Sequence, residues 1–589
     1  MRRILWVVLA AAAMVALPFL FRRPAAQAKW QLGDPVLVIV SPHNEAIREE
    51  YGHAFSAWHA KHYGRPAKVD WRVIGGTTEI MRYLASEYVG SMRAWWERDG
   101  HPWPAAGSDW MLDRRFDPDR PPAEADEAWE RRRDFYLAFR TNDAPGAATA
   151  RIDLFFGGGV YDHDKAQRQG LTVPPWPDEA AIPAGLFADA DGRELIPPGS
   201  SGEVWRGKAF FGNVLSTFGI CYNPDRLRAL GITNPPQAWA DLADPRYFGN
   251  VGVTDPTKSG SVAKAFEMII QQACRETVTA AGFIDDEIAG WEAAIAKARL
   301  PAGQLPDGVP VAYQEAVARG WCDGINRVRL IGANARYFTD SAGKVPIDVG
   351  MGATAVGIAI DFYGRFQSEY TRGADGEPRM RYLTPVGGSS VSADPISLLR
   401  GAPNRELAVR FITFCLGEEG QKLWNYRVGE PGGPHRYALR RLPIRRDFYP
   451  GEDPAFEAAA LAHGARCSDD LADPSVNPYQ LARAFIYRPR WTGAHFGIQR
   501  DLVRALCLDS GEELRAAWKH IQAHGGAERQ PEAMSWLLKM PQTPVPVTWA
   551  STVTDYASDK IDRLEYLRLW TSEMRANYRK AYASVRVGR

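Results

Sequence analysis

Apolar residues fall into two alternating patterns along the first part of the chain. A continuous apolar run at 35–40 is typical of a strand buried on both faces, and further strands are predicted at 69–74 and 152–156. The strands at 35–40 and 69–74 are each followed by a segment whose apolar residues recur at three-and-four spacing, as on one buried helix face. The alternation predicts an α/β fold with a parallel sheet covered by helices, and ligands at the carboxyl ends of its strands.

The stretch 249–274 shows a strand, a polar turn and a helix together. A β-branched run ends at Thr254, and Asp255-Pro256 leads into the turn Thr257-Lys258-Ser259-Gly260-Ser261. The helix that follows has one apolar face, and a turn serine can cap it. Its free amides, the hydroxyls and Lys258 suit an anion or another polar ligand, although an ordinary capped helix would show the same pattern.

A nucleotide-binding P-loop does not fit this turn. Thr257 stands where the motif needs glycine before the lysine, and Pro256 lacks an amide that a phosphate-wrapping loop would use. The glycines at 157–159 follow a strand and let the backbone approach a ligand, but the dinucleotide fingerprint is absent there and a tight strand-to-helix turn explains them equally well.

Length and charge limit the classes of function. A chain of 589 residues is expected to form two or more compact units. With 71 basic and 70 acidic residues the net charge is +1, so composition offers no electrostatic case for binding nucleic acid or an anionic membrane surface. Six widely spaced cysteines rule out a zinc knuckle and leave open whether they pair or remain free thiols.

The N-terminus has the features of an export signal. Two arginines precede an apolar run at 4–21, and Ala26 and Ala28 are the small residues that a signal peptidase reads. We expect residues 1–28 to export the protein from the cytoplasm, while the length of the run and the following Arg22-Arg23 leave an uncleaved membrane anchor open.

Several motifs, taken in order, resemble a known family. They are Ser41-Pro42-His43-Asn44, the strand and glycines at 152–159, the crossover 216–223, Trp239-Ala240-Asp241-Leu242, the turn 255–261, the segment 387–394 and the helix end 418–421. In this order they resemble the periplasmic solute-binding proteins of ABC importers, in the type II subgroup that includes iron(III)-binding receptors.

The resemblance implies two α/β lobes that close on a ligand about a hinge. The first lobe would span 34–213 and 381–425, with a surface insertion at about 91–145, and the second would span 214–380. The remaining residues, 426–589, have helical patterning and are expected to pack mainly on the second lobe.

Candidate ligand-binding residues come from the loops that both lobes would present to the cleft. They are Ser41, His43, Asn44, Gly76, Thr77, Gly158, Gly159, Thr257, Lys258, Ser259, Gly260, Ser261, Asp361 and Tyr363. The segment 357–367 falls where iron-type receptors carry paired tyrosines, but this chain has only Tyr363 there, with Asp361 two residues before it. These two residues would be the metal ligands if the cargo were iron(III).

The resulting hypothesis is a monomeric receptor without a cofactor that delivers a small polar or anionic solute to an ABC permease in the inner membrane. Iron(III) is the alternative cargo. The second alternative is an exported enzyme that uses the same cleft, although the sequence lacks recognisable hydrolase, metalloprotease and dinucleotide-binding motifs.

Overall fold

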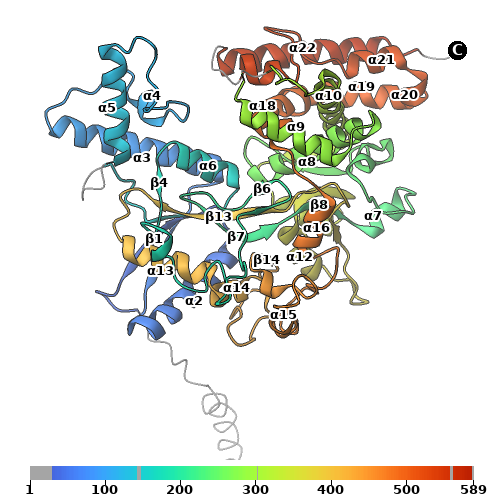
Figure 1. Ribbon diagram of the computed structural model, residues 1–589. Coiled ribbons are helices and arrows are strands. Elements are labelled where there is room, and N and C mark those ends of the chain that lie inside the picture. Colours follow the sequence, from blue (N-terminus) through green and yellow to red (C-terminus); the bar gives the residue numbers. More distant parts are fainter. Residues whose placement is uncertain (1–29, 142–147, 301–302, 557–560, 587–589) are drawn as a thin grey trace, which may run out of the picture.

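The computed structural model describes residues 30–141, 148–300, 303–556 and 561–586. Within these ranges the chain forms two lobes, each built on one β-sheet, so the expected two-lobed α/β fold is confirmed (Figure 1). The predicted export signal or anchor, residues 1–28, lies outside the described residues.

The sheet of the first lobe has the strand order β2-β1-β3-β13-β7-β14, with β4 paired to β13. Its strands are β1 (Val36–Val40), β2 (Lys68–Arg72), β3 (Leu154–Phe156), β4 (Thr172–Val173), β7 (Phe211–Ser216), β13 (Ser392–Leu399) and β14 (Leu442–Pro443). The surrounding helices are α2 (Glu45–Tyr63), α3 (Thr77–Arg98), α6 (Val160–Arg168), α13 (Arg405–Leu416) and α14 (Glu418–Asn425). Strands β1, β2 and β3 are parallel, as predicted, so their carboxyl ends share one edge.

The sheet of the second lobe has the order β10-β9-β11-β8-β12. Its strands are β8 (Phe218–Tyr222), β9 (Val251–Thr254), β10 (Ala335–Thr339), β11 (Val356–Ile360) and β12 (Arg381–Leu383). Its helices are α7 (Pro224–Ala229), α8 (Gly260–Ala280), α9 (Asp285–Ala298), α10 (Val311–Asn334), α11 (Lys344–Gly350) and α12 (Asp361–Tyr370). Helix α8 buries the apolar face that its sequence predicts, together with Glu267 and Gln271.

Two segments of the hinge connect the lobes. The chain leaves the first sheet in β7, passes Thr217 and enters the second sheet as β8, and it returns between β12 and β13. The expected start of the return at residue 381 is wrong, because Arg381–Leu383 pairs with β8 in the second sheet. Strands β7 and β13 are antiparallel, since they cross between the lobes in opposite directions.

The insertion is helical and begins later than predicted. Helix α3 runs without a break to Arg98, and only then do α4 (Gly107–Leu112) and α5 (Glu127–Thr141) project from the first lobe (Figure 1). Met111, Phe135 and Phe139 belong to the same hydrophobic cluster as Tyr88 and Met92 of α3, a cluster that also includes residues of the first sheet. The insertion therefore extends the first lobe along α3.

The region after residue 425 divides between the lobes. Its first part packs on the first lobe: β14 extends the first sheet, and the backbone at 435–437 donates to the buried carboxylate of Glu50. The elements here include α15 (Glu457–Gly464) and α16 (Pro478–Ala484). The expectation that this whole region packs mainly on the second lobe is wrong for this part, because β14 is too short to be recognised as a strand in the sequence.

The second part does pack on the second lobe. It comprises α17 (Pro489–Thr492), α18 (Phe496–Val503), α19 (Gly511–Ala523), α20 (Gly526–Arg529), α21 (Pro531–Leu537) and α22 (Arg563–Ala583). The fully buried Arg329 of α10 donates to the carbonyls of Leu537 and Lys539, and Trp518 of α19 donates to Asn334.

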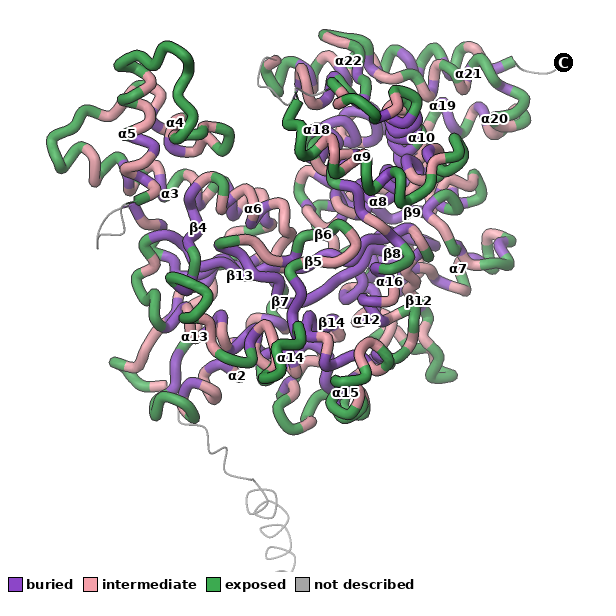
Figure 2. Tube along the Cα trace, viewed as in Figure 1, coloured by how far each residue is buried: buried purple, intermediate pink, exposed green. Residues whose placement is uncertain are grey.

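Buried residues run through the strands of both sheets, whereas the tips of the insertion are exposed and the last helices alternate between buried and exposed residues (Figure 2). All six cysteines are free thiols, and five of them are buried. No helix among the described residues combines the length and the apolar character needed to cross a membrane.

Candidate functional site

The loops at the carboxyl ends of β2 and β9 meet across the boundary between the lobes. A Cβ atom built at Gly76 would lie 2.9 Å from the carbonyl oxygen of Lys258. A Cβ atom at Gly260 would lie 3.3 Å from Oγ1 of Thr77 and 3.8 Å from Oδ2 of Asp162. The structure thus brings together predicted site residues from both lobes, and it adds Asp162, which the sequence did not single out.

The turn before α8 has the predicted form, but part of it supports its own structure. The Ser259 hydroxyl caps α8 by accepting from the amide of Val262 at 3.4 Å, and it lies 3.1 Å from the Ser261 hydroxyl. Thr257 donates both its amide and its hydroxyl to Asp255, at 2.8 and 2.7 Å. Lys258 is exposed. Lys258 and Ser261 are therefore better placed to bind a ligand than Thr257 is.

Helix N-termini from both lobes converge at this boundary. Gly76 is the N-cap of α3 and Gly159 is the N-cap of α6, and neither residue has a side chain that could satisfy the first amides. With the amino end of α8, three positive helix ends lie near one another. The carboxyl of Asp162 is buried among them, and burial raises its pKa, although Thr77 and Arg500 oppose that shift.

The glycines after β3 have a packing role that their sequence left open. Gly157 and Gly158 adopt positive φ angles of 88° and 101°. A Cβ atom at Gly157 would lie 2.3 Å from the ring of His43, and one at Gly158 would lie 2.3 Å from Cγ2 of Thr77. These glycines let the loops after β1, β2 and β3 pack closely, whereas a Cβ atom at Gly159 would meet open space.

A second group of predicted residues lies at the hinge side of the same boundary. The ring of His43 is 3.3 Å from Nη1 of Arg441. The guanidinium of Arg441 also donates to Asp394 at 2.5 Å and to the hydroxyl of Ser216 at 2.7 Å. Arg441 is fully buried, and its guanidinium lies 4.2 Å from the centre of the Phe362 ring in the second lobe.

The charges of this cluster are balanced. Burial lowers the pKa of His43, so the ring is neutral at pH 7. Burial would raise the pKa of Asp394, but Arg441 and His43 hold it below its usual value. Ser41 supports the cluster, because its hydroxyl accepts from the amide of His43 at 3.1 Å. Ser41, His43, Ser216 and Asp394 fall within motifs that the sequence singled out, whereas Arg441 does not and is far from them in sequence.

Asn44, Asp361 and Tyr363 also lie at the hinge side. The Asn44 side chain caps α2 by accepting from Ile47 at 3.0 Å, and the Asp361 carboxylate accepts from the amide of Thr217 at 3.1 Å. Asn44 and Tyr363 line one small cavity between α2 and α12. Burial raises the pKa of both Asp361 and Tyr363 and so favours their neutral forms.

The described residues contain no group of three or more His, Cys, Asp or Glu side chains that could hold a metal ion. Asp361 binds the hinge backbone through Oδ2, and its Oδ1 accepts from the amide of Phe362 at 2.8 Å. The carboxylate is therefore engaged in holding the start of α12.

Comparisons with known proteins agree with the resemblance seen in the sequence. Residues 205–299, which contain the turn before α8, match the family model of the bacterial extracellular solute-binding proteins. A protein of Haemophilus influenzae described as uncharacterized is 22% identical over 273 residues, which are 46% of this chain and 60% of that protein.

Solved structures of periplasmic binding proteins are also similar. The protein AfuA of Actinobacillus pleuropneumoniae, with fructose-6-phosphate bound, is 17% identical over 66% of this chain and 81% of its own, with a TM-score of 0.38. The apo ferric ion-binding protein A of Pasteurella haemolytica is 12% identical over 80% of this chain and 97% of its own, with a TM-score of 0.39. The spermidine/putrescine-binding protein PotD of Streptococcus pneumoniae is 13% identical over 80% of this chain and 100% of its own, with a TM-score of 0.40.

Proposed function

We propose that this protein is an extracytoplasmic receptor that binds a small polar or anionic solute between its lobes and delivers it to an ABC importer of the inner membrane. The observation that carries the proposal is the meeting of the Gly76–Thr77 loop with the Lys258–Gly260 turn. The match of residues 205–299 to solute-binding proteins supports it, because that segment contains the turn.

The chemistry of the boundary favours a polar or anionic solute. The positive ends of α3, α6 and α8 attract negative charge, the first turns of α3 and α6 have no side-chain cap, and Lys258 adds a formal charge beside them. A solute that contacts both lobes stabilises their closed arrangement through its differential affinity for that state. Delivery to a permease then requires the lobes to separate, as two rigid bodies about the hinge.

Iron(III) remains the alternative cargo, with Tyr363 as a phenolate and Asp361 as a carboxylate ligand. The structure supports it less well, because burial raises the pKa of Tyr363 and the Asp361 carboxylate already binds the hinge backbone. An absorbance titration with chelated iron(III) separates the two cargoes. A tyrosinate band in wild type that disappears in Tyr363→Phe would establish iron.

The proposal is tested by identifying what the protein carries. Native mass spectrometry and metal analysis of protein purified without refolding should show a bound small polar or anionic molecule. Calorimetry with that molecule should then show weaker binding by Ser259→Ala/Ser261→Ala, while the control Ser535→Ala in α21 binds as wild type does.

The double variant should remain folded at the temperature of the titration, because loss of the cap costs about 0.5–2 kcal/mol of stability. Unchanged affinity of the double variant would remove the turn from the site. Turnover of the molecule instead of its release unchanged would favour the exported enzyme.

A further inference from the structure

The C-terminal region makes a third connection between the lobes. Helix α16 is held to the first lobe, where the Tyr479 hydroxyl donates to the carbonyl of Ile444 at 2.5 Å. Helix α17 is held to the second lobe, where the indole of Trp491 donates to Tyr313 of α10 at 2.9 Å. Residues 485–488 therefore cross from one lobe to the other in addition to the two hinge segments.

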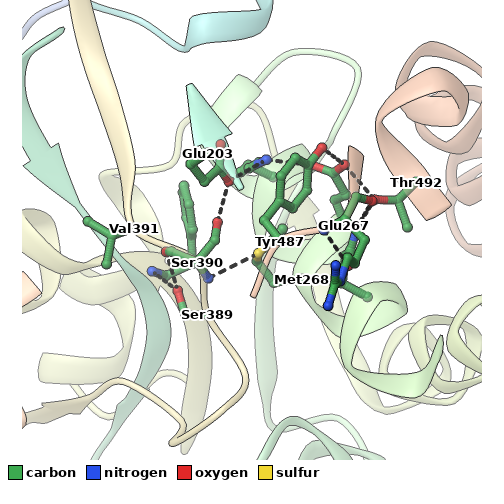
Figure 3. Close-up of polar contacts among 12 residues, drawn as sticks. Glu203, Glu267, Met268, Ser389, Ser390, Val391, Tyr487 and Thr492 are labelled. Atoms are coloured by element: carbon green, nitrogen blue, oxygen red, sulfur yellow. Dashed lines mark hydrogen bonds and ion pairs between the residues drawn. The ribbon is translucent and has the colours of Figure 1, made fainter. Parts of the chain in front are cut away.

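Tyr487, in the middle of this crossing, binds both lobes. Its amide donates to the carbonyl of Ser201 at 2.8 Å, in the hairpin of β5 (Gly199–Ser200) and β6 (Glu203–Val204) beside the first sheet. Its hydroxyl donates to Glu267 of α8 at 2.6 Å (Figure 3). The backbone contact is close, since a Cβ atom at Gly202 would lie 1.9 Å from the carbonyl oxygen of Tyr487.

A buried ionic cluster surrounds this crossing and joins the lobes directly. The ammonium of Lys264, on α8 in the second lobe, is 2.9 Å from Glu203 of the hairpin and 2.9 Å from Glu267. Ser390 of the hinge donates to Glu203 at 2.5 Å, and Thr492 of α17 donates to Glu267 at 2.7 Å (Figure 3). Each carboxylate thus has a cation and hydroxyl donors, which is the condition for a stable buried charge.

Helix α18 makes a second contact between the lobes, beside the candidate site. The guanidinium of Arg500 donates to the carbonyls of Pro256 and Thr257, at 2.8 and 3.0 Å, in the turn before α8. The same side chain donates to the hydroxyl of Thr78, in the first turn of α3, at 2.9 Å. One turn earlier, the ring of Phe496 lies 4.9 Å from that of Tyr161 in the first lobe. Arg500 therefore fixes the two site loops relative to each other.

We propose that residues 485–500 form an interlobe latch that holds the lobes together, with Arg500 as the residue that positions the two site loops. The latch packs on the second lobe from α17 onward, and it contacts the first lobe at the hairpin 199–204, at Tyr161 and at Thr78. Lobe separation requires these contacts to break, together with the contact between Lys264 and Glu203. The inference goes beyond the proposed receptor function and does not depend on any solute.

The test measures the distance between the lobes in protein stripped of small molecules. Spin labels at Ser86→Cys on α3 and Ala289→Cys on α9, both exposed positions, report the separation by pulsed dipolar spectroscopy. The background carries Cys322→Ser, because Cys322 is the one native thiol that is not buried. The variants are Arg500→Ala and the milder Thr78→Val, which removes one acceptor and keeps the shape of the side chain. The control is Arg504→Ala, whose side chain forms only a local ion pair with Asp509.

We expect wild type and Arg504→Ala to give one narrow, short distance distribution, and Arg500→Ala and Thr78→Val to give broader distributions with a longer component. All variants should keep the far-ultraviolet circular dichroism of wild type. A broad distribution in wild type, or unchanged distributions in both folded latch variants, would overturn the proposal. Because no solute is present, failure of the latch leaves the receptor function untouched, and failure to find a solute leaves the latch untouched.

Discussion

Replacing Gly76 by alanine should disturb the contact between the lobes without straining the first lobe, to which Gly76 belongs. Its φ angle is −72°, which any L-residue adopts, so alanine at this position introduces no backbone strain. Its Cβ atom would lie 2.9 Å from the carbonyl oxygen of Lys258 and 3.1 Å from the Glu79 carboxylate. The Glu79 side chain can rotate away, whereas the Lys258 backbone can move only with the second lobe.

The magnitude follows from this overlap. Forcing an added methyl group into a packed contact costs about 1–3 kcal/mol. Applied to the equilibrium between closed and open lobes, that free energy changes the ratio of the two states about 5- to 150-fold. Gly76→Ala should therefore populate a longer distance between the labels at residues 86 and 289, and it should weaken binding of a solute that needs both lobes by up to the same factor.

Two further glycines serve as controls. A Cβ atom at Gly90, also on α3, would meet nothing within 4 Å, so Gly90→Ala should stabilise the helix by about 0.5–1 kcal/mol and leave the interlobe distance unchanged. At Gly158 the φ angle is 101° and the collision is with Thr77 of the same lobe, so Gly158→Ala should lower stability. A Gly76→Ala protein that is less stable than wild type, but has the same distribution of interlobe distances, would refute the proposed role of this contact.

Two other predictions concern buried charge. Burial lowers the pKa of His163 from 6.5 to about 4, and its ring lies against Phe155 and between Ser397 and the carbonyl of Gly157. The unfolded chain thus binds a proton first, so His163 should lower the free energy of unfolding by up to about 3 kcal/mol as the pH drops from about 6.5 to about 4. In urea titrations His163→Gln should show a fall that is smaller by this amount, since other buried histidines such as His43 keep their own contribution. Lys264→Met leaves two buried carboxylates without their cation and should cost about 3–5 kcal/mol in urea unfolding, partly recovered by adding Glu203→Gln. Lys344→Met, which removes a lysine side chain that is 52% exposed, should cost less than about 1 kcal/mol. Equal losses in the two lysine variants would contradict the buried cluster.

Much of the fold could be predicted because hydrophobic periodicity is a local signal. The runs at 35–40 and 152–156 are strands β1 and β3, and the apolar face after Ser259 is the buried face of α8. The two-residue strand β14 and the short strand β12 could not be assigned in this way. Their positions depend on hydrogen bonds to β7 and β8, which are far away in sequence.

The sequence predicted those residues of the candidate site that lie in loops at the ends of strands. Gly76, Thr77, Lys258 and Gly260 come together because the carboxyl ends of parallel strands share one edge in each lobe. Arg500 could not be predicted, because nothing in the sequence around it indicates that α18 returns to the boundary between the lobes.

The hinge side shows the same limit. Asp394 lay within a recognised segment, but the partner that fixes its ionised form, Arg441, comes from the region after residue 425 and reaches Asp394 only through tertiary packing. Buried charged pairs between distant segments leave no periodic pattern in a sequence.

The central claim is that both lobes bind one solute, and the most direct test is a calorimetric titration of the co-purified solute against one variant from each lobe. Lys258→Gln removes a charge from the second lobe and Thr77→Val removes a hydroxyl from the first. The dissociation constant should rise about tenfold or more for Lys258→Gln and about two- to tenfold for Thr77→Val, as expected for a lost charged and a lost neutral hydrogen bond. A solute that binds both folded variants with the affinity of wild type would contradict it.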